Sequence, residues 1–200
     1  MLTFFIAVGT ECVTTEWIAR MDTDDIAVPD RFELQLNEIL KNPDIAVIGG
    51  QIDEFVGTPD NIVGKRNVPL TEKEIYKFAE LRNPFNHPTV MINKKKLLEV
   101  GGYKTANKLE DYNLWVQFMR NHAHLNNINE VLVHMRSGDS QYRRRGGTKY
   151  LISYMKMKNQ WRRQGVGNHK TVAISDISMI VNTIMSAKMR KYIYQHILHR

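Results

Sequence analysis

The 200-residue chain is long enough to form one domain with a substantial core, or a domain with an appendage. Its formal charge of +7 indicates an anionic partner, for which nucleotide sugars, anionic lipid head groups and nucleic acid all qualify. The single cysteine, Cys12, excludes a disulfide framework within the chain and fits the reducing cytoplasm. No run of about 18 uncharged apolar residues occurs, and the short apolar start lacks a basic region, so we expect neither a transmembrane helix nor a signal peptide.

The first predicted elements are strands. Aromatic and β-branched residues favour a strand over residues 2–8. An apolar run over residues 17–21 is typical of a buried strand in an α/β sheet, and it leads directly into three acidic residues. Pro29 then suits the first turn of a helix. The acids therefore lie at the carboxyl end of a strand, where open α/β sheets bind their ligands.

The spacing of these acids suggests a metal site. In an extended chain, Asp22 and Asp24 can face one point while Asp25 turns aside. Two converging carboxylates suit Mg²⁺ or Mn²⁺, which often bind through one or two carboxylates together with substrate phosphates. A solvated turn with an Asp capping the next helix is the competing interpretation. A calcium-binding EF-hand loop fails, because Ile26 and Ala27 stand where that loop needs an oxygen ligand and a glycine.

Apolar residues at helical spacing predict a helix over residues 29–42. Two strands are expected next, over residues 45–49 and 51–55, followed by a turn-rich excursion over residues 57–67. The residues expected on the buried face of the helix are Phe32, Leu36, Ile39 and Leu40.

Thr71 and Glu74 form a T-x-x-E capping box, which predicts a helix over residues 72–82. A proline-bounded loop containing His87 follows, and a strand is expected over residues 89–92. Residue type alone indicates that His87 is a structural histidine that bonds the loop backbone.

A short helix over residues 94–100 is expected to end at Gly101-Gly102. A longer helix over about 111–121 has Glu110 and Asp111 at its N-terminus, where position alone indicates a capping role. Its buried stripe should be Leu114, Trp115, Phe118 and Met119.

Edge strands joined by an Asn-Glu turn are predicted over residues 123–128 and 131–135. A basic run, Arg143-Arg144-Arg145, follows and is typical of a solvated face. Basic amphipathic helices can lie on anionic membranes or pack on the domain, and the last helix leaves both open. The predicted C-terminal helices are 148–164, 172–186 and 188–199.

Several segments together resemble family 2 glycosyltransferases of the GT-A fold, which build bacterial polysaccharides. The matching stretches are WIARMDTDDIAVPDRFELQ, NPFNHPTVM, VGGY, LEDYNLW and the region up to RRRGGTKY. They cover about residues 13–150 and follow the family's order, which makes the resemblance far more specific than the D-x-D motif alone.

The resemblance implies a partial GT-A domain over residues 1–150, with an α/β mixed sheet flanked by helices, and a helical C-terminal appendage over residues 151–200. Family members begin with a nucleotide-binding segment much longer than the stretch before Asp22. Most of that segment is therefore expected to be missing.

The resemblance also implies roles for single residues. Asp22 and Asp24 would hold Mn²⁺ or Mg²⁺, with Arg20 beside them at the nucleotide, and Asp111 would be the catalytic base. The family's histidine metal ligand has no counterpart, because Gly138 stands in its place, and Asp139 is a possible substitute. Residues that the resemblance places near the substrates are Glu110, Trp115, His87 and Arg144. The helical register of Trp115 favours a core position.

The implied function is a metal-dependent, inverting transfer of a hexosyl or N-acetylhexosaminyl group. The donor would be a nucleotide sugar, expected to be a UDP-sugar, and the acceptor a glycan or lipid-linked molecule in surface polysaccharide or capsule synthesis. Such a protein would work in the cytoplasm, with peripheral contact at the inner face of the cell membrane. The alternative is a non-catalytic remnant that associates with membranes or proteins. Nucleic acid is not an expected partner, because no basic pattern with interleaved aromatics occurs.

Overall fold

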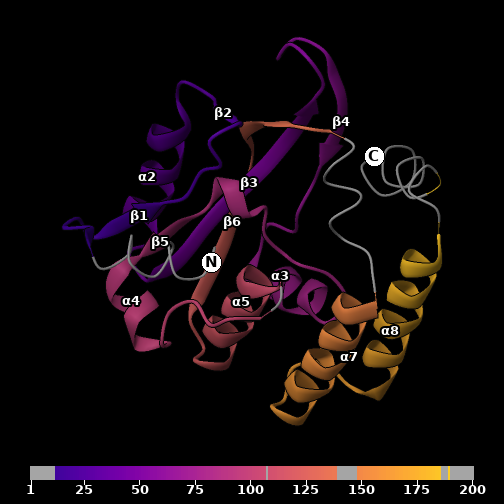
Figure 1. Ribbon diagram of the computed structural model, residues 1–200. Helices are drawn as coiled ribbons and strands as arrows, with labels where there is room; N and C mark the ends of the chain where they lie inside the picture. Colours follow the sequence, from indigo (N-terminus) through magenta and orange to yellow (C-terminus); the bar gives the residue numbers. More distant parts are fainter. Residues whose placement is uncertain (1–11, 107, 139–147, 186–188, 190–200) are drawn as a thin grey trace.

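The computed structural model describes residues 12–106, 108–138, 148–185 and 189, which form a mixed sheet flanked by helices (Figure 1). The strands are β1 (Trp17–Ala19), β2 (Ile26–Ala27), β3 (Ile45–Phe55), β4 (Ile62–Arg66), β5 (Met91–Asn93) and β6 (His124–Arg136). The helices are α2 (Arg31–Lys41), α3 (Glu72–Ala79), the 3-10 helix η1 (His87–Thr89), α4 (Lys94–Glu99), α5 (Glu110–Arg120), α7 (Thr148–Arg163) and α8 (His169–Ile184).

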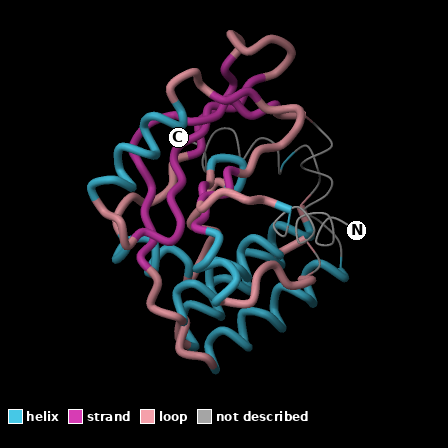
Figure 2. The backbone as a smooth tube through the Cα atoms, turned by 90° about the vertical axis from the view of Figure 1, so that its left-hand side faces the viewer, coloured by secondary structure: helices cyan, strands magenta, loops and turns pink. Residues whose placement is uncertain are grey.

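The centre of the sheet is the parallel pair of β3 and β6, which are its two longest strands. The order along the sheet is β1-β5-β3-β6-β2, and β4 pairs with β3. The main core lies between one face of the sheet and α3, α5 and α7, whereas a smaller cluster around Ile39 and Ile48 lies beneath α2. In Figure 2 the strands lie together in the upper half, and most of the helical backbone gathers below them.

Two pairs of predicted strands are single strands in the structure. β3 runs through Gly50 without a break, because β6 pairs with it on both sides of that residue. Leu132 of β6 packs closely against Gly50 and leaves no room for a side chain there. A Cβ atom on Gly50 would lie 2.6 Å from Cδ1 of Leu132. β6 absorbs the predicted turn as a bulge, since residues 128–130 face Gly50 across the pair. The prediction of edge strands is also wrong, because β6 lies between β3 and β2.

Two short strands were not predicted. β2 comes directly after the acidic residues and pairs with β6, and β4 lies within the predicted excursion and pairs with β3. Both depend on partners that are distant in sequence. β1 was predicted to be buried, but Trp17 and Ile18 are only half-buried. Among the described residues, β1 has a neighbour on one side only.

The predicted buried face of α2 is wrong apart from Ile39. Phe32, Leu36 and Leu40 are exposed, whereas Arg31 and Gln35 face the sheet and are buried. The polar side chains are buried because they bond backbone carbonyls there. Gln35 Nε2 donates to the oxygens of Ile48 at 3.0 Å and Thr89 at 2.9 Å. Arg31 Nη2 donates to the oxygen of Arg20 at 2.9 Å.

Several helix boundaries are confirmed. The capping box of Thr71 and Glu74 is formed at the start of α3. α4 is followed by Gly101 and Gly102, which have φ angles of +83° and +64°, in the left-handed region that glycine adopts readily. The predicted apolar stripe of α5 is buried in the main core. The start of α2 differs from its prediction, because Pro29 precedes the helix and Asp30 is the N-cap.

α7 and α8 pack side by side at the edge of the domain opposite α2 (Figure 1). Lys158 connects α7 to the core: its buried Nζ donates to the oxygens of Ala79 at 3.2 Å and Glu80 at 2.6 Å, and to Tyr112 Oη at 2.7 Å. Two of the three predicted C-terminal helices are thus present, although α8 begins earlier than predicted. The predicted strand over 2–8 and, apart from Met189, the helix over 188–199 lie outside the described residues. Within the described ranges, no helix is long and apolar enough to cross a membrane.

Replacing Gln35 by Leu should destabilise the fold, because two buried carbonyl groups lose a donor while the apolar volume is kept. We expect the free energy of unfolding to fall by about 2 kcal/mol, measured by urea denaturation. The matched control is Leu36→Gln, which places an amide on the exposed neighbouring position and should change stability by less than about 0.5 kcal/mol. Equal losses in both variants would contradict the role of Gln35.

Stability should also depend on pH through Lys158, because burial lowers the pKa of its ammonium group to about 7. Between about pH 7 and pH 10 the unfolded chain still holds a proton that the folded chain has released, so stability rises with pH. Urea denaturation should therefore show wild type gaining up to about 1 kcal/mol per pH unit relative to Lys158→Met. Lys156→Met, an exposed change on the same helix, should follow wild type. A difference between wild type and Lys158→Met that stays constant with pH would contradict the lowered pKa.

Candidate active site

The first part of the site lies at the carboxyl end of β1. The Arg20 guanidinium donates to both carboxylate oxygens of Asp22, with Nη1 to Oδ2 at 2.7 Å and Nη2 to Oδ1 at 2.5 Å. The backbone of Arg20 is held as well, because its N–H donates to the oxygen of Val90 at 2.9 Å and its carbonyl accepts from Arg31. The two hydrogen bonds from the Arg20 guanidinium fix the orientation of the Asp22 carboxylate at the end of the strand.

The acids after β1 lie in a turn and not in extended chain. Thr23 and Asp24 form the turn, and the Asp25 N–H donates to the oxygen of Asp22 at 3.3 Å. The extended-chain argument for Asp22 and Asp24 is therefore wrong, although the turn still keeps the acids together. None of these acids caps α2, whose N-cap is Asp30.

Asp25 and Asp24 also contact β6. The N–H of Arg136 donates to Asp25 Oδ1 at 2.9 Å, and Arg136 Nε donates to the backbone oxygen of Asp24 at 3.3 Å. Burial raises the pKa of Asp25 to about 6, the bond from Arg136 opposes this shift, and the charges of Asp22 and Asp24 add to it. The second oxygen of Asp25 is buried without a hydrogen-bond partner among the described residues.

This turn fits a divalent cation. Three carboxylates crowd into four residues, one buried carboxylate oxygen is unpaired, and the side chain of Asp24 is exposed. In the described part of the chain, no three His, Cys, Asp or Glu side chains converge as a closed set of metal ligands. An open site that relies on one or two carboxylates and on substrate phosphates matches the usual binding of Mg²⁺.

The second part of the site is the N-terminus of α5. Asn83 Nδ2 donates to Asp111 Oδ2 at 2.8 Å, while Asn83 Oδ1 accepts from the N–H of Phe85 at 3.2 Å. Because the N–H of Phe85 can only donate, it identifies the side-chain oxygen of Asn83, and the Asn83 nitrogen therefore points to Asp111. Leu109 is the N-cap of α5 and neither acid caps the helix, while Glu110 Oε1 accepts from a loop N–H at 3.4 Å.

His87 lies between these two parts. Its Nε2 is 3.0 Å from Tyr103 Oη, so it bonds a side chain instead of the loop backbone. Burial lowers the pKa of His87 to about 4, against the opposing charge of Asp111, so the imidazole is neutral near pH 7. The charges of Arg20 and Asp22 also act on His87. Predicted site residues that follow β1, and others on η1 and α5, thus lie close enough to interact electrostatically.

The chain is similar to known glycosyltransferases. The family model described as "Glycosyl transferase family 2" matches residues 7–102. The chain is 34% identical over 183 residues to "UDP-Gal:alpha-D-GlcNAc-diphosphoundecaprenol beta-1,3-galactosyltransferase" of Escherichia coli, covering 92% of this chain and 66% of that protein. The chain belongs to glycosyltransferase family 2.

Two further relatives are named as glycosyltransferases. An uncharacterized glycosyltransferase of Haemophilus influenzae is 41% identical over 74% of this chain and 52% of its own length. The amylovoran biosynthesis glycosyltransferase AmsE of Erwinia amylovora is 35% identical over 74% of this chain and 55% of its own length. The chain therefore spans between about half and two thirds of the length of these curated relatives.

Two solved structures show the same fold. Mannosyltransferase PcManGT from Pyrobaculum calidifontis, in complex with GDP-Man and Mn²⁺, aligns with a TM-score of 0.55 and 10% identity over 96% of this chain and 54% of that one. S. aureus TarS 1-349 aligns with a TM-score of 0.51 and 14% identity over 94% of this chain and 56% of that one. The predicted GT-A-like mixed sheet is thereby confirmed.

Not every predicted site residue of this family 2 chain joins the cluster. Trp115 is fully buried against Phe85, with ring centroids 4.9 Å apart, and its ring is in a T-shaped arrangement with that of His87 at 6.0 Å. It therefore supports His87 from the core, as its helical register indicates, and the predicted sugar-facing role is not supported. Arg144 and Asp139 lie outside the described residues.

Sequence reasoning missed Asn83 and Tyr103 as site residues. Both lie within segments that carry the resemblance, NPFNHPTVM and VGGY, so the motifs were available as a signal. What the motifs did not show is the bond partner of each side chain. Burial raises the pKa of Tyr103 far above its usual range, so its hydroxyl stays protonated beside His87.

Proposed function

We propose that the chain takes part in metal-dependent, inverting transfer of a sugar from a nucleotide-diphosphate donor to a glycan or lipid-linked acceptor. The observation that carries the proposal is that the loop around η1 contacts both acidic segments: Asn83 bonds Asp111, and the backbone oxygen of Val90 accepts from Arg20. The charges of Arg20, Asp22 and Asp111 act on His87 in the same loop. Charged groups that act on a half-buried histidine with a perturbed pKa are typical of an active site.

Donor binding would take place at the turn after β1. Asp24 and Asp22 would hold Mn²⁺ or Mg²⁺, which supplies positive charge to the leaving diphosphate. Arg20 keeps Asp22 in place through its bidentate hydrogen bond and adds a fixed positive charge nearby. His87 adds none, because its imidazole is neutral near pH 7.

Acceptor activation would take place at the N-terminus of α5. The acceptor hydroxyl oxygen attacks the anomeric carbon as the bond from that carbon to the diphosphate oxygen breaks, and the hydroxyl proton passes to Asp111. Asn83 occupies Oδ2 of Asp111, which leaves Oδ1 for the acceptor. A single displacement of this kind inverts the configuration at the anomeric carbon.

The relatives indicate the kind of substrates. The name of the Escherichia coli relative specifies UDP-Gal as donor and a diphosphoundecaprenol-linked sugar as acceptor. We propose a UDP-sugar and a lipid-linked or glycan acceptor for this chain, used in surface polysaccharide synthesis at the cytoplasmic face of the membrane. Glu110 and Arg144 remain proposed substrate contacts. We also propose that residues 1–150 form the transferase domain and residues 151–200 its appendage.

Calorimetric titration of UDP-sugars with and without Mn²⁺ tests donor binding. Because Asp24 would be a metal ligand with an exposed carboxylate, Asp24→Asn should weaken metal-dependent binding at least about tenfold. Asp30→Asn is the matched control, since Asp30 is exposed and makes no side-chain cap bond, and it should bind like wild type. A folded wild-type chain that binds no donor would favour the non-catalytic remnant.

Asn83→Ala tests the positioning of the base. Loss of a charge-assisted hydrogen bond should lower kcat by about tenfold to a hundredfold and leave the donor KM nearly unchanged. Asn121→Ala, the same change at the other end of α5, should keep kcat near wild type. Transferase assays at saturating donor measure both values, and a rise in donor KM without a fall in kcat would contradict the role given to Asn83.

A further inference from the structure

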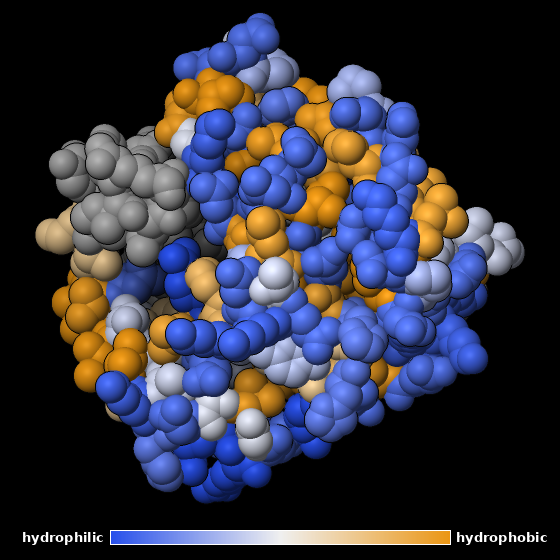
Figure 3. Space-filling view, turned by 180° about the vertical axis from the view of Figure 1, so that it is seen from behind, coloured by the Kyte–Doolittle hydropathy of each residue, from blue (hydrophilic) through white to orange (hydrophobic). Residues whose placement is uncertain are grey.

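The outer face of α8 is an apolar row. Ile174, Ile177, Val181 and Ile184 recur at helical spacing and are between 43% and 80% exposed. The inner face of α8 is buried at Val172 and Ser175, and Ser175 Oγ donates to the oxygen of Glu80 at 3.3 Å. In Figure 3, apolar side chains gather at the left edge of the molecule, where α8 lies. The row is therefore held outward by the packing of the opposite face.

Positive charge is concentrated in the same part of the chain. Residues 148–185 contain six Lys or Arg residues and one carboxylate, a formal charge of +5. Residues 186–200 add four Lys or Arg residues and no carboxylate. Residues 1–147, in contrast, contain eighteen Lys or Arg residues and twenty carboxylates, a formal charge of −2. The excess positive charge of the protein thus belongs to its C-terminal quarter.

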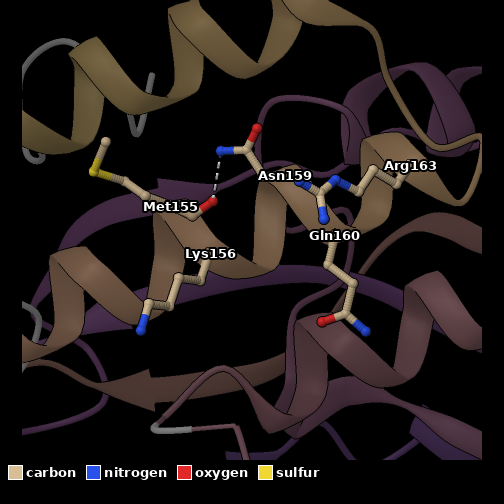
Figure 4. A pocket seen from close by; sticks show the side chains of 5 residues that line it. All are labelled: Met155, Lys156, Asn159, Gln160 and Arg163. Carbon is tan, nitrogen blue, oxygen red and sulfur yellow. Dashed lines mark hydrogen bonds between the residues drawn. The ribbon is translucent and has the colours of Figure 1, made fainter.

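Part of this charge lies on the surface of α7. Lys156 and Arg163 line a shallow surface cavity of about 500 Å³ together with Met155, Asn159 and Gln160 (Figure 4). α7 packs along α8, so these cations belong to the same helix pair as the apolar row. Aliphatic side chains next to lysine and arginine form the combination that binds the interface of an anionic bilayer.

We propose that the α7–α8 pair docks on the surface of an anionic lipid bilayer, with the apolar row of α8 entering the head-group region. α8 would lie in the plane of the membrane, because no described helix is long and apolar enough to span it. Lys and Arg residues of the pair would contact lipid phosphates. The inference goes beyond the proposed sugar transfer and does not require an active site.

Charge argues against a second copy of the chain as the occupant. A symmetric dimer through α8 would bring together two helix pairs that each carry a formal charge of +5. An anionic lipid surface neutralises the same charge and attracts each Lys or Arg near it. The bilayer is therefore the better match for this surface.

A second apolar row provides a control within the same molecule. Phe32, Leu36 and Leu40 of α2 are between 43% and 76% exposed, which is similar to the row on α8. The surroundings differ, because residues 30–44 contain four carboxylates and two cations. If charge selects the surface, α8 should bind anionic lipid and α2 should not.

Co-sedimentation of the full 200-residue chain with phospholipid vesicles tests the proposal. We expect binding to phosphatidylcholine vesicles that contain phosphatidylglycerol, and at least about tenfold weaker binding to phosphatidylcholine alone. Ile177→Ser combined with Val181→Ser should weaken binding to the mixed vesicles about tenfold. Leu36→Ser combined with Leu40→Ser should leave it unchanged. Far-ultraviolet circular dichroism should show that both double variants keep the wild-type fold.

Three results would overturn the proposal. The first is a folded wild-type chain that does not bind the mixed vesicles. The second is equal weakening by the α2 and α8 double variants, which would remove the role of charge. The third is a lipid-free dimer, seen by light scattering, that only the α8 double variant dissociates, because the row would then be a contact between copies. Donor binding by calorimetry is measured separately, so failure of the proposed transfer is distinguishable from failure of docking.

Discussion

The structure depends on buried side-chain amides that hold the irregular backbone around η1. Gln35 on α2 donates to the oxygens of Ile48 and Thr89, and so connects β3 to η1. Asn86 Nδ2 donates to the oxygens of Gly50 at 2.9 Å and Arg66 at 3.0 Å, and Thr89 Oγ1 accepts from the N–H of Gly50 at 3.1 Å. Buried carbonyls away from a regular ladder need such partners, and satisfying them fixes the loop in one conformation.

This constraint positions the candidate site. The loop that these amides hold also carries Asn83 and His87, so it brings the partner of Asp111 and the central imidazole to one place. β1 joins the same point, because Arg20 bonds the backbone of Val90 just after η1. The carboxylates of Asp22 and Asp111 are therefore oriented by the protein itself, so the site that we propose is arranged before any substrate binds.

The C-terminal helices are joined to this domain through polar contacts with the end of α3. Lys158 and Ser175 both bond the carbonyl of Glu80, and Tyr112 Oη donates to the oxygen of Ala79 at 2.6 Å. The C-terminus of a helix carries unsatisfied carbonyls, and these accept the hydrogen bonds of the buried Lys158 amine, although burial disfavours its charged form and lowers its pKa. Because these contacts hold the inner face of α8 against the domain, its outer face, which carries the apolar row, does not pack on the core.

The sequence by itself determined the family, the α/β class and the helices whose signals are local. The capping box at Thr71, the glycines after α4 and the apolar stripe of α5 depend on residues a few positions apart, so periodicity and capping rules find them. Only the tertiary structure decided the buried face of α2, the turn at Asp24 and the partners of Asn83 and His87. Gln35 and Thr89 are 54 residues apart, and a bond between a side chain and a distant backbone oxygen leaves no periodic pattern in the sequence. The continuity of β3 and β6 likewise depends on their pairing with each other, which the sequence does not show.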